Sequence, residues 1–268
     1  MSDLVFDARV LANDEIGSDI WILRLSTPRS LETFRAGAFL HIQVDPGQVP
    51  LFRRAYSILS ARHQEAEVLY KVAGAGTRLL SRHTAGDTVS VVGPLGNSFT
   101  TPGPDEMAVM VAGGVGLPPV LRWIENLSAS GVARDRMVML YGARNEGELV
   151  LRDRVLATGV RVEYATDDGS FGYHGRVTDL LSKEHEAASA RKARMRYYAC
   201  GPAAMLSACS GFTEKSLVPG ELALETPMPC GTGICLGCVV PCRSGDEVVF
   251  KRTCIDGPIF SAGDVLWP

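Results

Sequence analysis

The sequence lacks the signatures of a membrane, an exported or a nucleic-acid-binding protein. It contains no run of about 18 apolar residues, the length that a helix needs to cross a bilayer. Residues 1–10 include Asp3 and Asp7 and lack the basic segment followed by an apolar one that marks an export signal. The formal charge of -3 and the pI near 6.0 favour neither nucleic acid nor an anionic membrane as a partner. We therefore expect neither nucleic acid nor a membrane as a partner.

Histidine is scarce, whereas cysteine and apolar residues are not. The five histidines lack metal-ligand spacing and are predicted at surface or turn positions: His41, His63, His83, His174 and His185. Because disulfides are rare in reducing compartments, seven cysteines without an export signal predict a cytoplasmic protein. A hydrophobic fraction of 46% over 268 residues is enough for two domains or one large one.

Four cysteines near the end of the chain have the spacing C-x4-C-x2-C…C, by which plant-type folds hold a 2Fe-2S cluster. They are Cys230, Cys235, Cys238 and Cys254. Glycines between them allow the positive φ angles that a loop close to a cluster needs. A structural zinc site would favour paired C-x2-C motifs, and a disulfide pair fits seven cysteines poorly. Cys242 could replace Cys254, but it follows Cys238 too closely to wrap round a cluster easily.

The first hundred residues are predicted to form a small antiparallel β-barrel, because short β-branched or alternating runs are separated by turn residues. The predicted strands are Val5–Val10, Ile20–Leu25, Phe39–Val44, Tyr56–Leu59, Val68–Val72 and Val89–Val92. The turn-rich segment Gly93–Phe99 then closes the barrel or simply marks a domain boundary.

Two polar motifs in this half could hold a flavin nucleotide. Arg54 can fork onto a pyrophosphate, while Tyr56 can lie against a flavin and Ser57 can reach a ring nitrogen. An ordinary edge strand with surface charge explains this stretch equally well. Gly76 and Thr77 lie in a glycine motif ahead of a short predicted helix, where backbone amides can approach a second phosphate.

From residue 107 the pattern changes to alternating strands and helices, which predicts a parallel sheet with ligands at the carboxyl ends of its strands. Gly113, Gly114 and Gly116 follow the apolar run Met107–Ala112, but they depart from the G-x-G-x-x-G fingerprint. Cys200-Gly201-Pro202 ends another predicted strand and faces the same crevice. Cysteine at such a position is more often a small buried residue than a reactive one.

These motifs, in this order and over nearly the whole chain, resemble the ferredoxin-NADP reductase superfamily. The motifs are Arg54-Ala55-Tyr56-Ser57, Gly76-Thr77, Gly113-Gly114-Val115-Gly116 and Cys200-Gly201-Pro202. The cysteine segment narrows the resemblance to the electron transfer subunits of NAD-dependent dihydroorotate dehydrogenase type B. The resemblance implies a β-barrel plus α/β fold with an FAD-binding barrel (1–101), an NAD-binding α/β domain (102–219) and a 2Fe-2S segment (220–268).

The resemblance also implies where three cofactors bind: FAD, NAD and the cluster. FAD would contact the barrel at Arg54, Ala55, Tyr56, Ser57, Leu69, Tyr70, Lys71, Gly76 and Thr77. NAD would contact Gly113, Gly114, Gly116, Cys200, Gly201 and Pro202, and the cluster would be held by Cys230, Cys235, Cys238 and Cys254. Nothing resembles an orotate site, so no catalytic residue for that substrate is expected in this chain.

A separate FMN-containing catalytic subunit is therefore implied, in a heterotetramer of two subunits of each kind that serves pyrimidine (UMP) biosynthesis. Five apolar residues are candidates for docking it, although local packing is the alternative: Ile234, Leu236, Ile255, Ile259 and Phe260. Two other interpretations stay open. The chain could belong to another NAD(P)H-dependent redox complex, such as a ferredoxin or sulfide oxidoreductase, or it could be a redox-sensing binding module.

Overall fold

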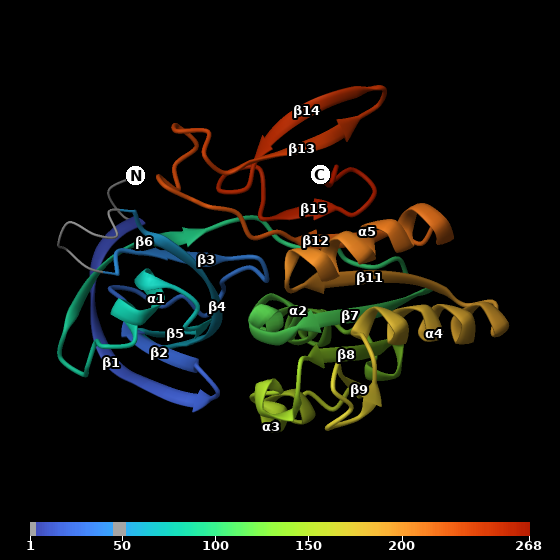
Figure 1. Cartoon of the computed structure of the whole chain (residues 1–268), viewed down its shortest axis with the longest axis horizontal. Coiled ribbons are helices and arrows are strands. Elements are labelled where there is room, and N and C mark those ends of the chain that lie inside the picture. Colours follow the sequence, from blue (N-terminus) through green and yellow to red (C-terminus); the bar gives the residue numbers. More distant parts are fainter. Residues whose placement is uncertain (1–3, 45–51) are drawn as a thin grey trace.

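The computed structural model describes residues 4–44 and 52–268, so that Asp3 lies outside the described residues. The first part is a closed antiparallel barrel with strand order β1-β2-β5-β4-β3-β6, as the sequence predicts (Figure 1). Its strands are β1 (Val5–Gly17), β2 (Ile20–Ser26), β3 (Phe39–Ile42), β4 (Arg54–Arg62), β5 (Glu65–Lys71) and β6 (Thr88–Leu95), with the short helix α1 (Ala75–Leu80) between the last two.

Alternation along each strand explains the barrel. In β3, Leu40 and Ile42 are completely buried in the barrel core beside Leu23 and Val68, while Phe39 belongs to a different cluster outside it. Successive side chains of a strand point to opposite faces. The strand β3 therefore has one face in the barrel interior and one face turned to another part of the chain.

The second part is a mostly parallel sheet with order β10-β9-β8-β7-β11-β12-β15, flanked by helices. Its elements up to residue 223 are β7 (Glu106–Gly113), α2 (Leu117–Ala129), β8 (Met137–Ala143), α3 (Arg152–Leu156), β9 (Arg161–Thr166), β10 (Tyr173–His174), α4 (Val177–Ala190), β11 (Arg194–Cys200), α5 (Ala203–Ser216) and β12 (Gly220–Ala223). The strand order reverses between β7 and β11, which is where ligands bind in open sheets of this kind.

The C-terminal segment forms a hairpin of β13 (Val239–Ser244) and β14 (Glu247–Arg252), followed by β15 (Ile259–Ser261). In Figure 1 the hairpin stands above the rest of the molecule. Strand β15 pairs antiparallel with β12, which in turn pairs with β11. The segment after residue 219 therefore joins the second sheet through β12 near its start and through β15 near its end.

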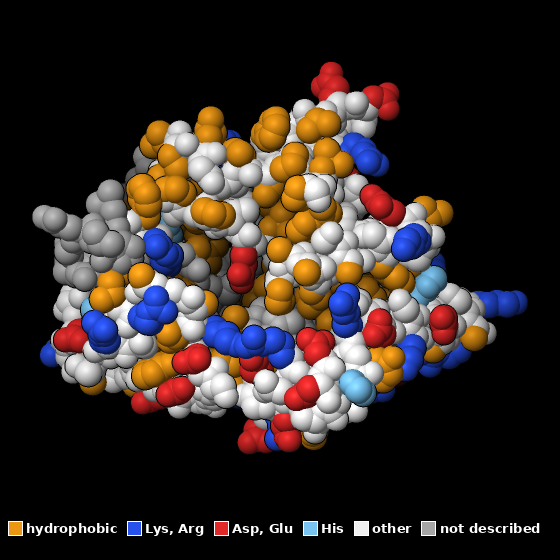
Figure 2. Space-filling view, in the orientation of Figure 1, with side chains coloured by type: hydrophobic (Ala, Val, Ile, Leu, Met, Phe, Trp, Pro, Cys, Tyr) orange, Lys and Arg blue, Asp and Glu red, His pale blue; other side chains and the backbone are white. Residues whose placement is uncertain are grey.

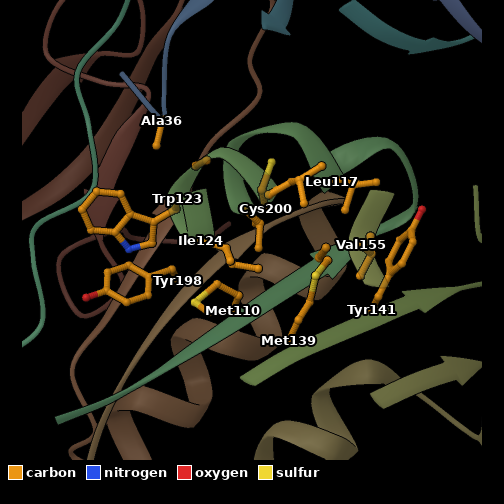
Figure 3. Close-up of a cluster of buried hydrophobic side chains, with 14 of the residues drawn as sticks. Ala36, Met110, Leu117, Trp123, Ile124, Met139, Tyr141, Val155, Tyr198 and Cys200 are labelled. Carbon is orange, nitrogen blue, oxygen red and sulfur yellow. The ribbon is translucent and has the colours of Figure 1, made fainter. Parts of the chain in front are cut away.

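The barrel and the sheet share one hydrophobic core. Ile20, Ala36 and Leu59 of the barrel pack in the same cluster as Trp123 and Ile124 of α2, part of which is drawn in Figure 3. Burial of apolar surface on this scale fixes how the two parts sit against each other. Within the described residues, no helix has the length and apolar character of a membrane span.

Candidate functional site

A cleft of about 1170 Å³ opens between the barrel, the carboxyl end of the second sheet and the segment after β12. The sequence-predicted FAD and NAD residues all line it except Gly76 and Cys200. Those that do are Arg54, Ala55, Tyr56, Ser57, Leu69, Tyr70, Lys71, Thr77, Gly113, Gly114, Gly116, Gly201 and Pro202. The fold thus gathers residues that are up to about 150 positions apart into one wall, as expected for a ligand cleft.

The barrel wall of the cleft carries a buried hydroxyl that no atom of the described residues satisfies. Within residues 4–44 and 52–268 the Tyr56 hydroxyl has no hydrogen-bond partner, although its ring is buried against Tyr70 with the centroids 5.8 Å apart. Burial raises the pKa of Tyr56, so the group remains a donor. A buried orphan hydroxyl costs free energy unless a ligand pairs with it, and a flavin offers ring and sugar acceptors. The residues present therefore fit FAD.

In the glycine motif at the start of α1, two backbone N–H groups are hydrogen-bonded to the side chain of Thr77. The Thr77 Oγ1 accepts hydrogen bonds from the backbone N–H groups of Ala73, at 2.9 Å, and Gly74, at 3.1 Å. Gly76 is buried within α1 and does not line the cleft. Thr77 thus shapes the turn at the cleft wall.

At the point where the strand order reverses, Gly116 packs directly on the end of β11. A Cβ atom at residue 116 would lie 2.4 Å from the Cys200 carbonyl oxygen, so only glycine allows this approach. The ends of β7 and β11 are held together closely as a result. Backbone therefore packs directly on backbone between Gly116 and Cys200, at the floor of the cleft.

The Cys200 side chain points away from the cleft. It is buried in the core between the barrel and the second sheet, where Figure 3 shows it beside Leu117. Burial raises the pKa of its thiol well above the ordinary value, and the nearby Glu225 carboxylate adds to the effect. Cys200 is therefore a small buried residue whose backbone, not its thiol, borders the glycine loop.

Sequence reasoning missed several cleft residues that come from the end of β8, from helices of the second part and from the segment after β12. They are Gly142, Ala143, Glu148, Arg176, Val177, Thr178, Met205 and Leu224 to Pro229. The rule that ligands bind at carboxyl ends of parallel strands could have found Gly142 and Ala143, which end β8. Leu224 to Pro229 have no motif, and only the fold brings them to the cleft.

One buried carboxylate holds two cations at the cleft wall. The Glu148 Oε1 accepts hydrogen bonds from Lys71 Nζ, at 2.8 Å, and from Arg144 Nε, at 2.9 Å. Burial alone would raise the pKa of Glu148, but the bonds from Arg144 and Lys71 outweigh it and lower the pKa. Glu225 lies on the opposite wall, where desolvation raises its pKa.

The four cysteines of the predicted cluster site come together as two pairs. The Cys238 and Cys254 Sγ atoms are 3.2 Å apart, and Cys230 interacts with Cys235. In the described residues, no three ligand-type side chains converge as a single metal ion would require. Four thiolates can hold either a 2Fe-2S cluster or a zinc ion, and it is the C-x4-C-x2-C spacing that favours the cluster. Cys242 lies elsewhere, in the core with Phe260.

The local environment already favours the thiolate form of Cys230. Burial would raise the pKa of Cys230, but hydrogen bonds from Thr232 and Cys235 outweigh it and lower the pKa to about 5. At the other pair, burial and the Cys238 thiol raise the pKa of Cys254 to about 12. Two thiols this close cannot both ionise without a cation between them, so the donor set fits a cluster.

Two expectations about the C-terminal segment and the histidines are wrong. Ile259 and Phe260 are 5% and 6% exposed and pack in the cores around the second sheet, because β15 joins that sheet; they cannot dock a partner.

His41 is not a surface or turn residue, since it lies on β3 with no exposed area. Burial lowers its pKa, against the effect of the Met228 and Arg53 carbonyls.

Comparisons with known proteins match all three parts of the chain. Residues 7–99 match the oxidoreductase FAD-binding domain, 110–211 match the oxidoreductase NAD-binding domain, and 225–266 match the iron-sulfur cluster binding domain of dihydroorotate dehydrogenase B. The electron transfer subunit of dihydroorotate dehydrogenase B (NAD(+)) from Desulforamulus reducens is 33% identical over 265 residues, which are 98% of each chain. The subunit of that name from Geobacillus kaustophilus is 38% identical over 251 residues, 91% of each chain.

This chain belongs to that family. As an electron transfer subunit of dihydroorotate dehydrogenase B, it is an oxidoreductase subunit with FAD-, NAD- and iron-sulfur-binding domains, as the sequence predicts. A solved NADH-dependent reduced ferredoxin-NADP oxidoreductase has the same architecture, with a TM-score of 0.82 and 27% identity over 97% of this chain and 90% of that one. A ferredoxin NADP+ reductase from Neisseria gonorrhoeae, 21% identical over 80% of this chain and 92% of that one, shares the fold with a TM-score of 0.64.

Proposed function

We propose that this chain carries electrons between an FMN-containing catalytic subunit, which oxidises dihydroorotate, and NAD+, in pyrimidine (UMP) biosynthesis. One observation carries the proposal. A single cleft has the predicted flavin residues on one wall and the glycines of the second sheet on another, and the segment from Leu224 to Pro229 leads from it directly to Cys230. Such a cleft would bring both dinucleotides together beside the cluster loop.

In this proposal FAD converts the two electrons of a hydride into single electrons, which a 2Fe-2S cluster accepts one at a time. The chain's own residues bind and orient. Arg54 would bind the pyrophosphate, while Tyr56 and Ser57 would donate hydrogen bonds to the flavin. Lys71 is held at the cleft wall by Glu148 and would keep a positive charge beside the bound nucleotide.

The proposed NAD contacts are Gly113, Gly114, Gly116, Gly201 and Pro202, with the backbone end of Cys200 behind them. A 2'-phosphate would need a free cation, as arginines supply in NADP-binding folds. Arg144, the cation at the end of β8, is already paired with the buried carboxylate of Glu148. This pairing makes Arg144 less available to a 2'-phosphate, in keeping with the proposal of NAD as the partner cofactor.

Cys230, Cys235, Cys238 and Cys254 would hold the 2Fe-2S cluster in the third part of the chain. We retain the division into residues 1–101, 102–219 and 220–268 as a proposal based on these roles. The seven cysteines, none of which forms a disulfide in the described residues, suit a reducing cytoplasm.

The catalytic partner would dock on the exposed apolar face beside the cluster loop. Ile234, Leu236 and Ile255 are 83%, 58% and 49% exposed. Figure 2 shows apolar side chains gathered along the upper rim of the molecule, over the C-terminal segment. Large apolar side chains exposed together mark interaction sites. An assembly of two subunits of each kind is part of the proposal.

Co-purification and reconstitution test this function. The second chain that accompanies this one should contain FMN, and mixing the two should couple dihydroorotate oxidation to NAD+ reduction. This chain alone should oxidise NADH with an artificial acceptor but leave dihydroorotate unchanged. A partner without FMN, or no coupled reaction in the mixture, contradicts the proposal.

The likeness to the reduced ferredoxin-NADP oxidoreductase favours a second candidate function. In that case the chain would be the flavin and iron-sulfur subunit of another NAD(P)H-dependent redox complex. The same co-purification separates the two candidates, because the second predicts a partner that carries other redox centres in place of a single FMN.

A further inference from the structure

The strand β3 faces the barrel core with one side and the cluster loop with the other. Leu40 and Ile42 point into the barrel. On the opposite side, Phe39 packs with Met228, Cys238 and Cys254. His41 lies two residues after Phe39, so it shares this outer face. It is also paired in register with Ala55 of β4, which lines the cofactor cleft.

The His41 ring connects β3 to the start of the cluster loop. Its Nε2 is 2.8 Å from the carbonyl oxygen of Met228, 187 positions later in the chain. A carbonyl oxygen only accepts hydrogen bonds, so Nε2 carries the proton. In the neutral ring Nδ1 is then a bare acceptor, and which nitrogen is protonated follows from the bond that the other makes.

That second nitrogen is buried without a partner. Nδ1 forms no hydrogen bond in the described part of the chain, and His41 has no exposed area. The atom faces Gly231, the residue after the first cluster cysteine: a Cβ atom built at residue 231 would lie 2.5 Å from it. An unsatisfied buried acceptor requires an explanation, and Gly231 of the cluster loop lies directly beside it.

We propose that His41 is a positioning residue that fixes the cluster loop against the flavin barrel, with Nε2–H bound to the Met228 carbonyl and Nδ1 accepting a backbone N–H at Gly231 when the cluster is bound. The inference rests on the proposed cluster site. His41 itself does not line the cleft, although its hydrogen-bond partner Met228 does, so we expect its main effect on the cluster and on transfer of an electron between flavin and cluster.

The test uses three substitutions at residue 41 in the full chain reconstituted with FAD and iron-sulfur cluster without air. His41→Leu removes both polar contacts, His41→Gln places a donor near the position of Nε2, and His41→Asn places an acceptor near Nδ1. Ile42→Val is the matched control, because it trims the same strand on its barrel face.

The readouts are the rate at which a chelator removes the cluster, the electron paramagnetic resonance spectrum of the reduced cluster, and the rates at which NADH reduces flavin and then cluster. In His41→Leu we expect at least tenfold faster cluster loss, an altered spectrum and at least tenfold slower cluster reduction, with flavin reduction within twofold of wild type. His41→Gln and His41→Asn should each be intermediate. Ile42→Val should change only the melting temperature.

Two results would overturn the inference. In one, His41→Leu matches Ile42→Val in cluster loss and spectrum. In the other, Gln and Asn are no better than Leu, which would mean that the ring only fills space. If Leu does not fold, the Gln and Asn variants decide alone, and wild-type behaviour of both rejects the role. A wild-type chain that binds no cluster would refute the proposed function instead, so the two failures are distinguishable.

Discussion

The barrel meets the second sheet and the cysteine loop in very different ways. Against the sheet it buries a continuous apolar core, reinforced by the ion pair of Glu67 with Arg154 and by Arg122, which lies 4.3 Å from the Phe34 ring centroid. Against the cysteine loop, the described buried cluster consists of Phe39, Met228, Cys238 and Cys254. Two of these four side chains are the proposed cluster ligands.

This difference indicates which contacts depend on the cluster. Most of the flavin and nicotinamide cleft is shaped by the barrel and the second sheet, whose apolar cores form without a metal, and only its edge at Phe39 and Met228 packs with the cysteines. The cysteine loop has exposed residues between Gly231 and Cys238, and it would gain its core only when the metal binds, since metal binding supplies folding free energy. We therefore expect the two regions to fail independently.

The largest expected effect comes from removing one cluster ligand. Cys235→Ser should abolish the cluster spectrum and electron transfer to the partner, because four thiolates are needed, while leaving FAD reduction by NADH nearly intact. Visible spectroscopy and stopped-flow reduction measure both. Cys242→Ala is the control: it should lower stability by about 1–2 kcal/mol but keep the cluster, since that thiol lies in another core. A Cys235→Ser chain that also loses flavin reduction contradicts the independence of the two regions.

A smaller effect is expected at the floor of the cleft. Gly116→Ala would place a methyl group 2.4 Å from the Cys200 carbonyl oxygen. The backbone would have to shift to remove this clash, and overpacking of this kind costs about 1–3 kcal/mol. We expect this cost to weaken NADH binding at the displaced glycine loop. At 1.4 kcal/mol per factor of ten, the KM for NADH should rise about tenfold to hundredfold, with the cluster spectrum unchanged. The control is Gly211→Ala on α5, where a Cβ atom meets nothing within 4 Å. Equal NADH kinetics in both variants would refute the role of this close approach.

Two glycines of the C-terminal segment, one in the cysteine loop and one in the turn between β13 and β14, distinguish backbone strain from steric collision. Gly231 and Gly245 have φ angles of 70° and 62°, but a Cβ atom meets His41 at the first and open space at the second. Both alanine variants should lose about 1 kcal/mol from the left-handed conformation. Only Gly231→Ala should release the cluster faster, by several-fold, in a chelator assay. The same release rate in both would show that the contact with His41 has no effect.

The smallest effect concerns the ion pair between barrel and sheet, and it depends on pH. Burial would raise the pKa of Glu67, but hydrogen bonds from Arg154 and Ser60 outweigh it, so its folded pKa lies below the ordinary 4.5. A lowered folded pKa contributes stability that is present above the unfolded pKa and is lost as pH falls through the folded value. Glu67→Gln should thus cost about 1 kcal/mol at pH 7 and nothing at strongly acid pH, as measured by urea unfolding.

The control for this pair is Glu125→Gln, which breaks an ion pair whose Glu125 side chain is 50% exposed and should change stability little. A pH-independent loss in Glu67→Gln would contradict the electrostatic origin of the effect. In neither variant do we expect the cluster spectrum to change.

The sequence predicted those parts of the molecule that local patterns determine. Alternating short strands predicted the barrel, the strand and helix alternation predicted the parallel sheet, and the cysteine spacing predicted a thiol site of which the fold brings Cys238 and Cys254 within 3.2 Å of each other. Each of these depends on residues that are near in sequence or on a fixed spacing.

What could not be predicted depends on contacts between distant residues. The pairing of β15 with β12 buries Ile259 and Phe260, and the outward face of β3 buries His41 under Met228. For Cys200 the sequence predicted a small buried residue, which is confirmed, but not that its side chain lies in the core shared with the barrel instead of the crevice. No local pattern reports which face of a strand another part of the chain will cover.

The most direct test of the account is an anaerobic titration of the isolated, reconstituted chain with NADH, followed by visible and electron paramagnetic resonance spectra. We predict that the flavin absorbance bleaches and that the signal of a reduced 2Fe-2S cluster then appears, with Cys235→Ser giving the first change and not the second. A colourless protein that holds only zinc at the four thiols, or a cluster that stays oxidised while the flavin is fully reduced, would contradict it.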